Sequence, residues 1–522
     1  MAAREQVEKC ARLLSRKSTD DEKFAGLLLL PRVVDAQDAE SWSLVFDAMD
    51  MRFIERLLRT GLKQSEDNML LNIAVSIVDV LASHTSIATS PRMLERIPTL
   101  CAVAVADTDT VSAEARLALC RLLSHDAAVE MLLELPDSLA QIVSAAKTSS
   151  EPKAIAQFVD YALNRCSQVV HTQCIIAERA RGWVSAVTCV AAAFEQSHTI
   201  LKFELISALA NALEPIATTD AAVIDEQTPC LPLAMSISAG CIGILKQKSE
   251  TTAYADQALA LYSHLVRLWP RYVFSGLATH NTKADAVDKK EAELVLRLAC
   301  VEGQASLDAM MIAPPSAGTH EAAEDCKRIR RGWKLPVCAE IAAGWLEWVA
   351  RWLDELPPDS PNVNEAAIYT VMNEVQKLAT AVIGFLVDWK ERTRGEQAML
   401  ANGPELTVST VHFLAQWLAT DPKLHRAAMP VLPMCTAWIL GSSDHSDTIA
   451  EYVRPCISFA LETCGISEAQ YADDLMTHEL HHDRTRADEF ASPWVGTIEF
   501  DDLARAVYSI PSDEDMLRDR QS

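Results

Sequence analysis

Glycine makes up only 16 of the 522 residues of this chain, while apolar residues return at helical spacing from Arg4 to Cys464. Average proteins contain roughly 7% glycine. Parallel sheets and dinucleotide-binding folds use it for turns and phosphate loops. A chain with about 3% glycine and a helical apolar period is therefore predicted to be all-α.

The helical blocks are separated by polar loops at uneven intervals, so no strict repeat period can be read. Ankyrin and TPR repeats have fixed signatures, whereas armadillo and HEAT-like units of roughly forty residues tolerate such drift. Stacked helical pairs can also extend one core over a long chain without domain boundaries. We predict an armadillo/HEAT-like α-solenoid over residues 1–465 and an acidic C-terminal segment, 466–522, that caps the last repeat.

Apolar spacing predicts a helix at about 41–58, with Trp42, Phe46 and Phe53 on one stripe, and a central helix at 69–81. The polar segment 218–229 is predicted to be a loop. Further helices are predicted at 91–105, 111–123, 126–134, 137–147, 152–166, 171–179, 182–195, 199–213, 232–247, 252–268, 288–310, 320–330, 336–354, 362–389, 404–419, 422–440 and 446–464.

The net charge and the cysteines indicate which kinds of partner and which cellular compartment suit this protein. A net charge of −25 would repel the phosphates of a nucleic acid and favours basic protein segments as partners. The 14 cysteines stand singly in apolar runs without a C-x-x-C motif, which is typical of reduced core thiols. The first residues lack the apolar stretch of a signal peptide, and Ala2 stands where myristoylation requires glycine. These features predict a cytoplasmic protein.

One uncharged run, Gln227 to Leu245, has to be considered as a membrane span. Pro229 and Pro232 interrupt it, and the run after Pro232 is shorter than the roughly 20 apolar residues that a bilayer requires. We therefore predict a buried helix that begins near Pro232, and no transmembrane segment.

Short segments in a consistent order resemble the neurochondrin family over about residues 10–440. They are Glu22-Lys23-Phe24-Ala25-Gly26-Leu27-Leu28-Leu29 with Phe46-Asp47-Ala48, Phe53 and Arg56-Leu57-Leu58; Ile97-Pro98 with Leu100; Lys202-Phe203-Glu204-Leu205; and Leu298-Ala299-Cys300-Val301-Glu302. A weaker match to the family follows at Phe413-Leu414, Trp417-Leu418-Ala419 and Leu432-Pro433.

The resemblance implies an armadillo-like helical scaffold. Neurochondrins act as cytosolic signalling adaptors. Animal members are reported to bind receptor tails and small GTPases and to take part in the regulation of calmodulin-dependent kinase. Animal members continue well past the end of this chain and carry an N-terminal cysteine pair associated with lipidation, whereas the only early thiol here is Cys10. The matched residues are mainly core positions and name no active site, so the resemblance implies a non-catalytic adaptor in intracellular signalling or trafficking.

The sharpest chemical motif is H-E-x-x-H at 478–482, where His478 and His482 on one helical face bind zinc and Glu479 acts as general base in metallopeptidases. Zinc helices are normally apolar around the motif, but Asp473 and Asp483 flank this one. We therefore favour an exposed helix end and keep a zinc metallopeptidase as the alternative. No G-x-S-x-G, P-loop or G-x-G-x-x-G occurs, so we predict no catalytic residue and no cofactor.

Two further clusters are candidates for partner binding. Trp345, Trp348 and Trp352 fall at i, i+3 and i+7, which suits either core packing or a partner groove, since Trp is enriched among interface anchors. Dense positive charge occurs at Lys327, Arg328, Arg330, Arg331 and Lys334. Such a cluster is either a solvated helix end or a contact for acidic peptides or an anionic membrane surface. A carrier of basic peptides resembling importin alpha is a third possibility, but no tryptophan here is followed by Asn four residues later.

Overall fold

The computed structural model describes residues 2–35, 38–63, 69–106, 109–146, 151–172, 177–216, 218–247, 252–278, 287–311, 334–356, 363–393, 404–432, 459 and 463–464. The helices are α1 (Ala2–Leu13), α2 (Asp20–Val33), α3 (Ala39–Ala48), α4 (Met51–Lys63), α5 (Met69–Ala82), α6 (Thr85–Ala88), α7 (Pro91–Leu94), α8 (Ile97–Ala104), α9 (Asp109–Leu123), α10 (Asp126–Leu133), α11 (Pro136–Ala146), α12 (Pro152–Thr172), α13 (Ala177–Gln196), α14 (Ile200–Leu213), α15 (Thr218–Gln227), α16 (Leu231–Leu245), α17 (Thr252–Leu268), α18 (Pro270–Ala278), α19 (Lys289–Met311), α21 (Lys334–Glu355), α22 (Glu365–Thr393), α24 (Pro404–Thr420), the 3-10 helix η1 (Pro422–Leu424) and α25 (His425–Ala428). No β-strand occurs in these ranges, so the prediction of an all-α fold is confirmed.

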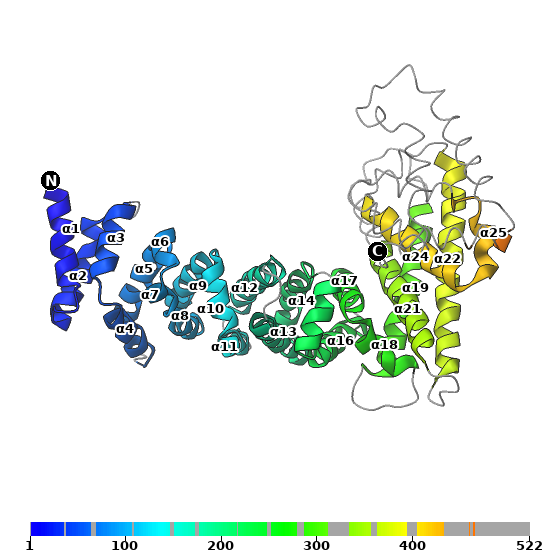
Figure 1. Cartoon of the computed structure of the whole chain (residues 1–522), viewed down its shortest axis with the longest axis horizontal. Coiled ribbons are helices and arrows are strands. Elements are labelled where there is room, and N and C mark those ends of the chain that lie inside the picture. The colour runs from blue at the N-terminus through cyan, green and yellow to red at the C-terminus, as the bar shows by residue number, and fades with distance from the viewer. Residues whose placement is uncertain are drawn as a thin grey trace, which may run out of the picture.

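The longer helices alternate between two rows that run the length of an elongated molecule (Figure 1). Row A consists of α5, α9, α12, α14, α17, α21 and α24, each packed on the next. Row B consists of α4, α8, α11, α13, α16, α19 and α22, again in contact from one to the next. Each row B helix also packs on the row A helix that follows it in the chain. This arrangement is the α-solenoid that the sequence predicts.

Contacts between successive pairs reveal the repeat length that the sequence hides. Arg96 bonds Glu55 41 residues away, and the hydroxyl of Ser167 lies 2.7 Å from the carbonyl oxygen of Ala212, 45 residues away. Farther along, Arg267 reaches Glu214 over 53 residues. The separation varies along the chain, with 51 residues from Asp160 to Asn211 and 45 from Lys246 to Glu291, so the sequence shows no fixed period. Most of these values lie near the unit length of roughly 40–47 residues of armadillo and HEAT repeats.

Arginines in row A fix how neighbouring helices are aligned. Arg121 donates to the carbonyl oxygen of Asp79 in α5 at 3.1 Å, and Arg165 donates to that of Leu123 in α9 at 3.0 Å. Arg267 donates to the carbonyl oxygen of Glu214, which follows α14, at 3.3 Å. The last carbonyls of a helix lack intrahelical partners and carry partial negative charge, so a cation from the next repeat satisfies them.

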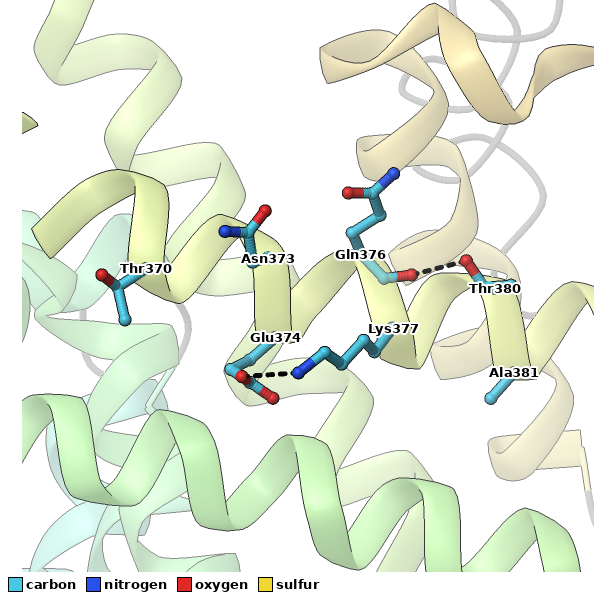
Figure 2. A pocket seen from close by; sticks show the side chains of 7 residues that line it. All are labelled: Thr370, Asn373, Glu374, Gln376, Lys377, Thr380 and Ala381. Atoms are coloured by element: carbon cyan, nitrogen blue, oxygen red, sulfur yellow. Dashed lines mark hydrogen bonds and ion pairs between the residues drawn. The ribbon is translucent and has the colours of Figure 1, made fainter. Parts of the chain in front are cut away.

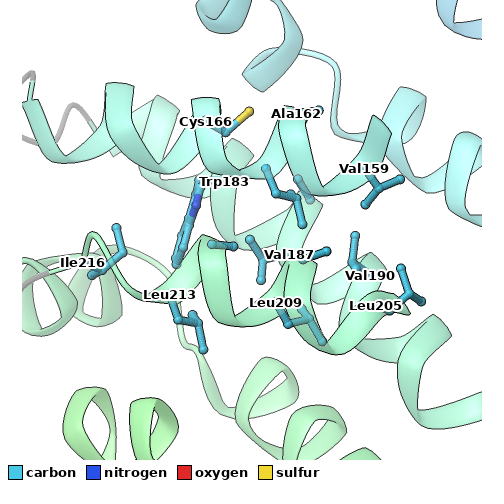
Figure 3. Close-up of a cluster of buried hydrophobic side chains, with 14 of the residues drawn as sticks. Val159, Ala162, Cys166, Trp183, Val187, Val190, Leu205, Leu209, Leu213 and Ile216 are labelled. Atoms are coloured by element: carbon cyan, nitrogen blue, oxygen red, sulfur yellow. The ribbon is translucent and has the colours of Figure 1, made fainter. Parts of the chain in front are cut away.

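The core is one continuous cluster of buried apolar side chains that extends from Val7 to Leu432. Figure 3 shows its part between α12, α13 and α14, where Trp183 lies between the helices. The indole Nε1 of Trp183 donates to Ser167 Oγ at 2.8 Å, and this hydroxyl lies 2.9 Å from the Leu163 carbonyl oxygen. Both polar groups are fully buried, and their hydrogen bonds remove the cost of burying them unpaired.

The single helix predicted at 41–58 is wrong, because the chain breaks between α3 and α4. Asp50 is the residue that breaks it. Its backbone N–H donates to the carbonyl oxygen of Leu14, which follows α1, at 2.9 Å. Its carboxylate accepts the backbone N–H of Arg52 at 3.3 Å and the ammonium of Lys23 at 2.9 Å. The apolar stripe continues across so short a break, so periodicity alone does not show it.

The loop predicted at 218–229 is also wrong, because residues 218–227 form α15. Ala221 and Ile224 are fully buried on its inner side, and tertiary burial of this kind overrides a polar composition. By contrast, α16 begins at Leu231, as predicted near Pro232. The predicted helices at 320–330 and 446–464 lie mostly or wholly outside the described residues, and segment 466–522 lies wholly outside them.

No single helix in the described ranges has the length and apolarity to cross a bilayer. One pair of neighbouring helical segments, Asp220–Glu226 with Leu231–Leu245, meets the length and composition criteria when taken together. The two segments are bent by 119° relative to each other.

Candidate protein-interaction surface

The outer face of row A carries a band of polar and aromatic side chains that meet across the seams between helices. Between α12 and α14, Asn211 donates to Asp160 at 2.8 Å. Between α17 and α21, the ammonium of Lys334 lies 2.8 Å from Asp256. These side chains are half-buried, so they close the seams and remain in contact with solvent. We define the row A band as Lys153, Asp160, Phe203, Glu204, Asn211, Tyr254, Asp256, His264 and Lys334.

An aromatic pair closes the seam between α14 and α17. The rings of Phe203 and Tyr254 stack with their centroids 4.0 Å apart and their planes at 26°. Both side chains are half-buried, and Ile200, one turn earlier on α14, is 55% exposed. An apolar patch of this kind within a polar band is the composition expected at a contact for another protein.

Two histidines on row A are held in their neutral form. Burial lowers the pKa of His264 to about 4, and Arg267 adds to the shift, since its guanidinium lies 3.3 Å from His264 Nδ1. Burial also lowers the pKa of His412 on α24, against the opposing effect of Glu347.

Acidification should weaken the fold through His264. Between its ordinary pKa of 6.5 and about 4, the unfolded chain binds a proton that the folded chain does not, so stability falls as the pH falls through this window. We expect His264→Gln to remove up to about 3 kcal/mol of that loss. Urea unfolding at several pH values measures it, with the exposed His198→Gln as the matched control. Equal pH slopes for His264→Gln and the natural chain would contradict the assignment.

Of the basic cluster, the structure describes Lys334 alone; Lys327, Arg328, Arg330 and Arg331 lie outside the described residues. The ammonium of Lys334 is held between Asp256 at 2.8 Å and Glu302 at 3.0 Å. Burial alone would lower the pKa of Lys334, but these two hydrogen bonds raise it. Lys334 is therefore an internal ion-pair partner that joins α17, α19 and α21.

The tryptophan stripe forms one aromatic ladder. Trp345 packs edge-on against Phe274 at 5.2 Å, Trp348 follows at 5.7 Å from Trp345, and Trp352 stacks on Trp348 at 5.6 Å. Trp345 is fully buried and Trp348 is 8% exposed. These two are core residues whose indoles are covered by the chain itself, while Trp352 at the end of the ladder is half-buried.

The H-E-x-x-H residues His478, Glu479 and His482 lie outside the described residues. Within the described ranges, no three His, Cys, Asp or Glu side chains lie close enough together to hold a metal ion.

The described cysteines are free thiols, most of them buried. Burial raises the pKa of Cys101, Cys166 and Cys300 to about 12. A thiol reacts through its thiolate, so these groups remain protonated and serve as apolar filling at neutral pH. The prediction of reduced core thiols is confirmed for these residues.

Helix α22 carries an open groove of about 650 Å³, which Figure 2 shows from close by. It is lined by Thr370, Asn373, Glu374, Gln376, Lys377, Thr380 and Ala381. Lys377 pairs with Glu374 at 2.8 Å, and the hydroxyl of Thr380 donates to the carbonyl oxygen of Gln376 at 2.8 Å. The lining belongs to one face of one helix, so the groove is an open surface and not an enclosed reaction chamber.

Apart from Lys334, sequence reasoning missed the residues of the row A band, and it missed the α22 groove. The sequence singled out Phe203 and Glu204 only as members of a family-like segment. It did not single out Tyr254, because the pairing of Tyr254 with Phe203 depends on how the repeats are aligned. Two other family-like segments also make ion pairs between helices: Lys23 pairs with Asp50, and Glu302 pairs with Lys334.

Comparison with known proteins finds relatives that carry the neurochondrin name. The neurochondrin of Rattus norvegicus is 32% identical over 116 residues, which are 21% of this chain and 16% of that protein. The neurochondrin homolog of Drosophila melanogaster is 32% identical over 100 residues, covering 18% of this chain and 14% of that protein. The aligned segments thus span only about a seventh of these curated relatives.

The fold comparison is weaker than the sequence comparison. A solved engineered protein aligns at 17% identity with 50% of this chain and 96% of its own length, with a TM-score of 0.31. The sequence profile of the family described as Neurochondrin, however, matches residues 2–444. Since that match covers most of the chain, this protein belongs to the neurochondrin family.

Proposed function

We propose that this chain is a non-catalytic scaffold of the cytoplasm, which binds other proteins through its solenoid surface in intracellular signalling or trafficking. The observation that supports this best is the row A band, where polar and aromatic side chains remain partly in contact with solvent across α12, α14, α17 and α21. A band over several helices suits an extended protein partner, because each seam offers another contact point.

The way the molecule is stabilised supports the same function. Each helical pair buries its apolar face against its neighbours, so the outer side chains of row A are free to be selected for recognition. Family membership adds to this, since curated relatives share the family name over the aligned segments. Buried free thiols agree with a reducing compartment such as the cytoplasm.

Affinity purification of the tagged full chain from its native cell tests the proposal. We expect a reproducible set of proteins that is lost when Asp160 and Glu204 are both changed to Lys. Glu134→Lys with Glu178→Lys is the matched control, because both glutamates are exposed and lie off the row A band. Circular dichroism and thermal unfolding of each variant show that the fold is kept.

Two results would count against the scaffold. One is a set of partners that no band substitution changes. The other is stoichiometric zinc together with peptidase activity, both lost in His478→Ala with His482→Ala, which would establish the metallopeptidase alternative.

We further propose that the basic cluster Lys327, Arg328, Arg330 and Arg331 makes a peripheral contact with anionic membranes. Each basic residue near such a surface contributes about 1 kcal/mol, and salt screens the attraction. We expect sedimentation with phosphatidylserine vesicles to fall steeply with added salt and to be lost when the four residues are changed to Glu. Binding that is unchanged by salt or by charge reversal would refute this contact.

A further inference from the structure

Lys202 on α14 lacks the acidic partner that the structure gives to other largely buried lysines. The ammonium of Lys23 pairs with Asp50 at 2.9 Å, and that of Lys334 pairs with Asp256 at 2.8 Å. Lys202 is only 4% exposed, yet among the described residues its ammonium has neither a hydrogen bond nor an ion pair. An unpaired buried ammonium costs free energy, because it has lost water without gaining a counter-charge.

The surroundings of this ammonium place it at the seam between α13 and α16. It lies 5.4 Å from the ring centroid of Phe194 on α13. A Cβ atom added to Gly243 on α16 would lie 2.9 Å from Nζ of Lys202. Apart from α16 itself, only Nζ and Cε of Lys202 lie within 4 Å of that Cβ position. The cation therefore has an aromatic ring beside it, and the missing side chain of Gly243 leaves free space next to its nitrogen.

This free space lies on the solvent-facing side of α16. Met235, Ala239 and Gly243 fall at i, i+4 and i+8, so they share one side of the helix. Met235 is 39% exposed, and the other two residues are half-buried. No residue of α16 carries a charge. The helix thus offers a neutral outer face of mostly small residues with one cation behind it.

Glu195 on α13 does not neutralise Lys202. Its carboxylate accepts a hydrogen bond from the hydroxyl of Ser236 at 2.8 Å across the same seam, and no ion pair joins these described residues to the ammonium. Burial lowers the pKa of Lys202, and the charge of Glu195 opposes that shift only in part. A single carboxylate would complete the pairing, whereas a phosphate dianion would bring excess negative charge beside Glu195.

We propose that Lys202, reached beside Gly243 at the α13–α16 seam, binds an acidic side chain of a partner protein. This inference rests on the proposed scaffold function and adds a contact point on row B. The small residues of α16 let a partner backbone approach closely, and the ammonium attracts the partner's carboxylate. Elsewhere the net charge of −25 repels an acidic segment, which directs the partner's acid to this seam.

A binding site of this kind makes the free chain less stable than it would be without the cation. Lys202→Met removes the unpaired charge and keeps a long side chain beside Phe194, so its thermal unfolding midpoint should equal or exceed that of the natural chain. Lys23→Met, which breaks a formed ion pair, should have a lower midpoint. A lowered midpoint for Lys202→Met as well would show that its ammonium already has a partner within the chain, and the proposal would be wrong.

Fluorescence anisotropy with the full chain and a labelled Gly-Ser peptide that contains two glutamates tests the binding itself. The same peptide with glutamine in place of glutamate is the neutral control. We expect the glutamate peptide to bind about 10-fold more tightly, although the net charge of the chain opposes it. Lys202→Met should abolish this preference. Gly243→Ala should weaken it, because the added methyl group fills the space beside Nζ.

Lys9→Met and Gly384→Ala are the matched controls, because both positions are exposed and lie on other helices, so both variants should keep the preference for glutamate. Equal binding of the two peptides by the natural chain, or an undiminished preference in folded Lys202→Met, would overturn the Lys202 site. If the preference is absent and the natural chain still recovers its partners from cells, the scaffold function stands and this contact fails. If the natural chain recovers no partners, the scaffold function itself fails.

Discussion

Gly182→Ala should lower the free energy of unfolding by about 3 kcal/mol or more. A Cβ atom at this position of α13 would lie 2.0 Å from the carbonyl oxygen and 2.9 Å from the carbonyl carbon of Leu133, the last residue of α10. Backbone atoms cannot rotate away as a side chain does, so one of the two helices has to move. Movement there would disturb the packing of α10 against α12 and α13.

Gly384→Ala is the matched control, because this exposed helical glycine has no atom within 4 Å of an added Cβ. Alanine favours a helix over glycine by roughly 0.5–1 kcal/mol, so this variant should be slightly more stable than the natural chain. Urea unfolding followed by circular dichroism measures both. A solenoid can unfold in parts, so an early separate transition in Gly182→Ala also counts as destabilisation. Stability equal to the natural chain would show that α10 and α13 are not in this contact.

Lys23→Met should destabilise the N-terminal helices by about 3–5 kcal/mol, which is typical for removing one partner of a buried ion pair. The side chains of Lys23 and Asp50 are only 6% and 12% exposed, and their charged atoms lie 2.9 Å apart. Without the ammonium, the half-buried Asp50 carboxylate loses its ion-pair partner and keeps the backbone N–H of Arg52 as a donor. Thermal unfolding of the variant and of the exposed Lys9→Met control measures the difference.

The pH dependence separates this charge effect from lost packing. In the natural chain, burial would raise the pKa of Asp50, but the hydrogen bond and charge of Lys23 lower it overall. The stabilisation that ionised Asp50 contributes is complete above the ordinary carboxyl pKa. It is lost as the pH falls through the lowered pKa of Asp50 in the folded chain. In Lys23→Met the hydrogen bond and the charge of Lys23 no longer lower the pKa of Asp50, so the variant should lose less stability on acidification and its deficit should shrink. Lys23→Met with Asp50→Asn should recover much of the loss, and a deficit independent of pH would contradict the pairing.

Individual helices were predictable because local apolar spacing determines them. Residues 252–268 form α17 with the bounds that the sequence predicts, and the prediction at 69–81 matches α5 within one residue. Each of these helices buries the apolar face that its sequence pattern marks. The all-α solenoid follows from many such helices joined by short turns.

Features that depend on contacts between repeats could not be predicted. The break at Asp50 is stabilised by Leu14 and Lys23 from earlier helices, and α15 is helical because its inner side is buried. The Phe203–Tyr254 pair needs the alignment of α14 with α17, which a drifting repeat length conceals. The helical spacing of the tryptophan stripe suits core packing first and a partner groove second, and the burial of Trp345 and Trp348 places these two in the core.

Small-angle X-ray scattering of the full chain tests most directly whether the helical pairs stack in one extended row. A compact globule of 522 residues has a radius of gyration of about 24 Å. The two-row solenoid predicts a value well above this and a distance distribution with a long tail. A radius near about 24 Å with a symmetric distribution would contradict the solenoid and the row A band with it.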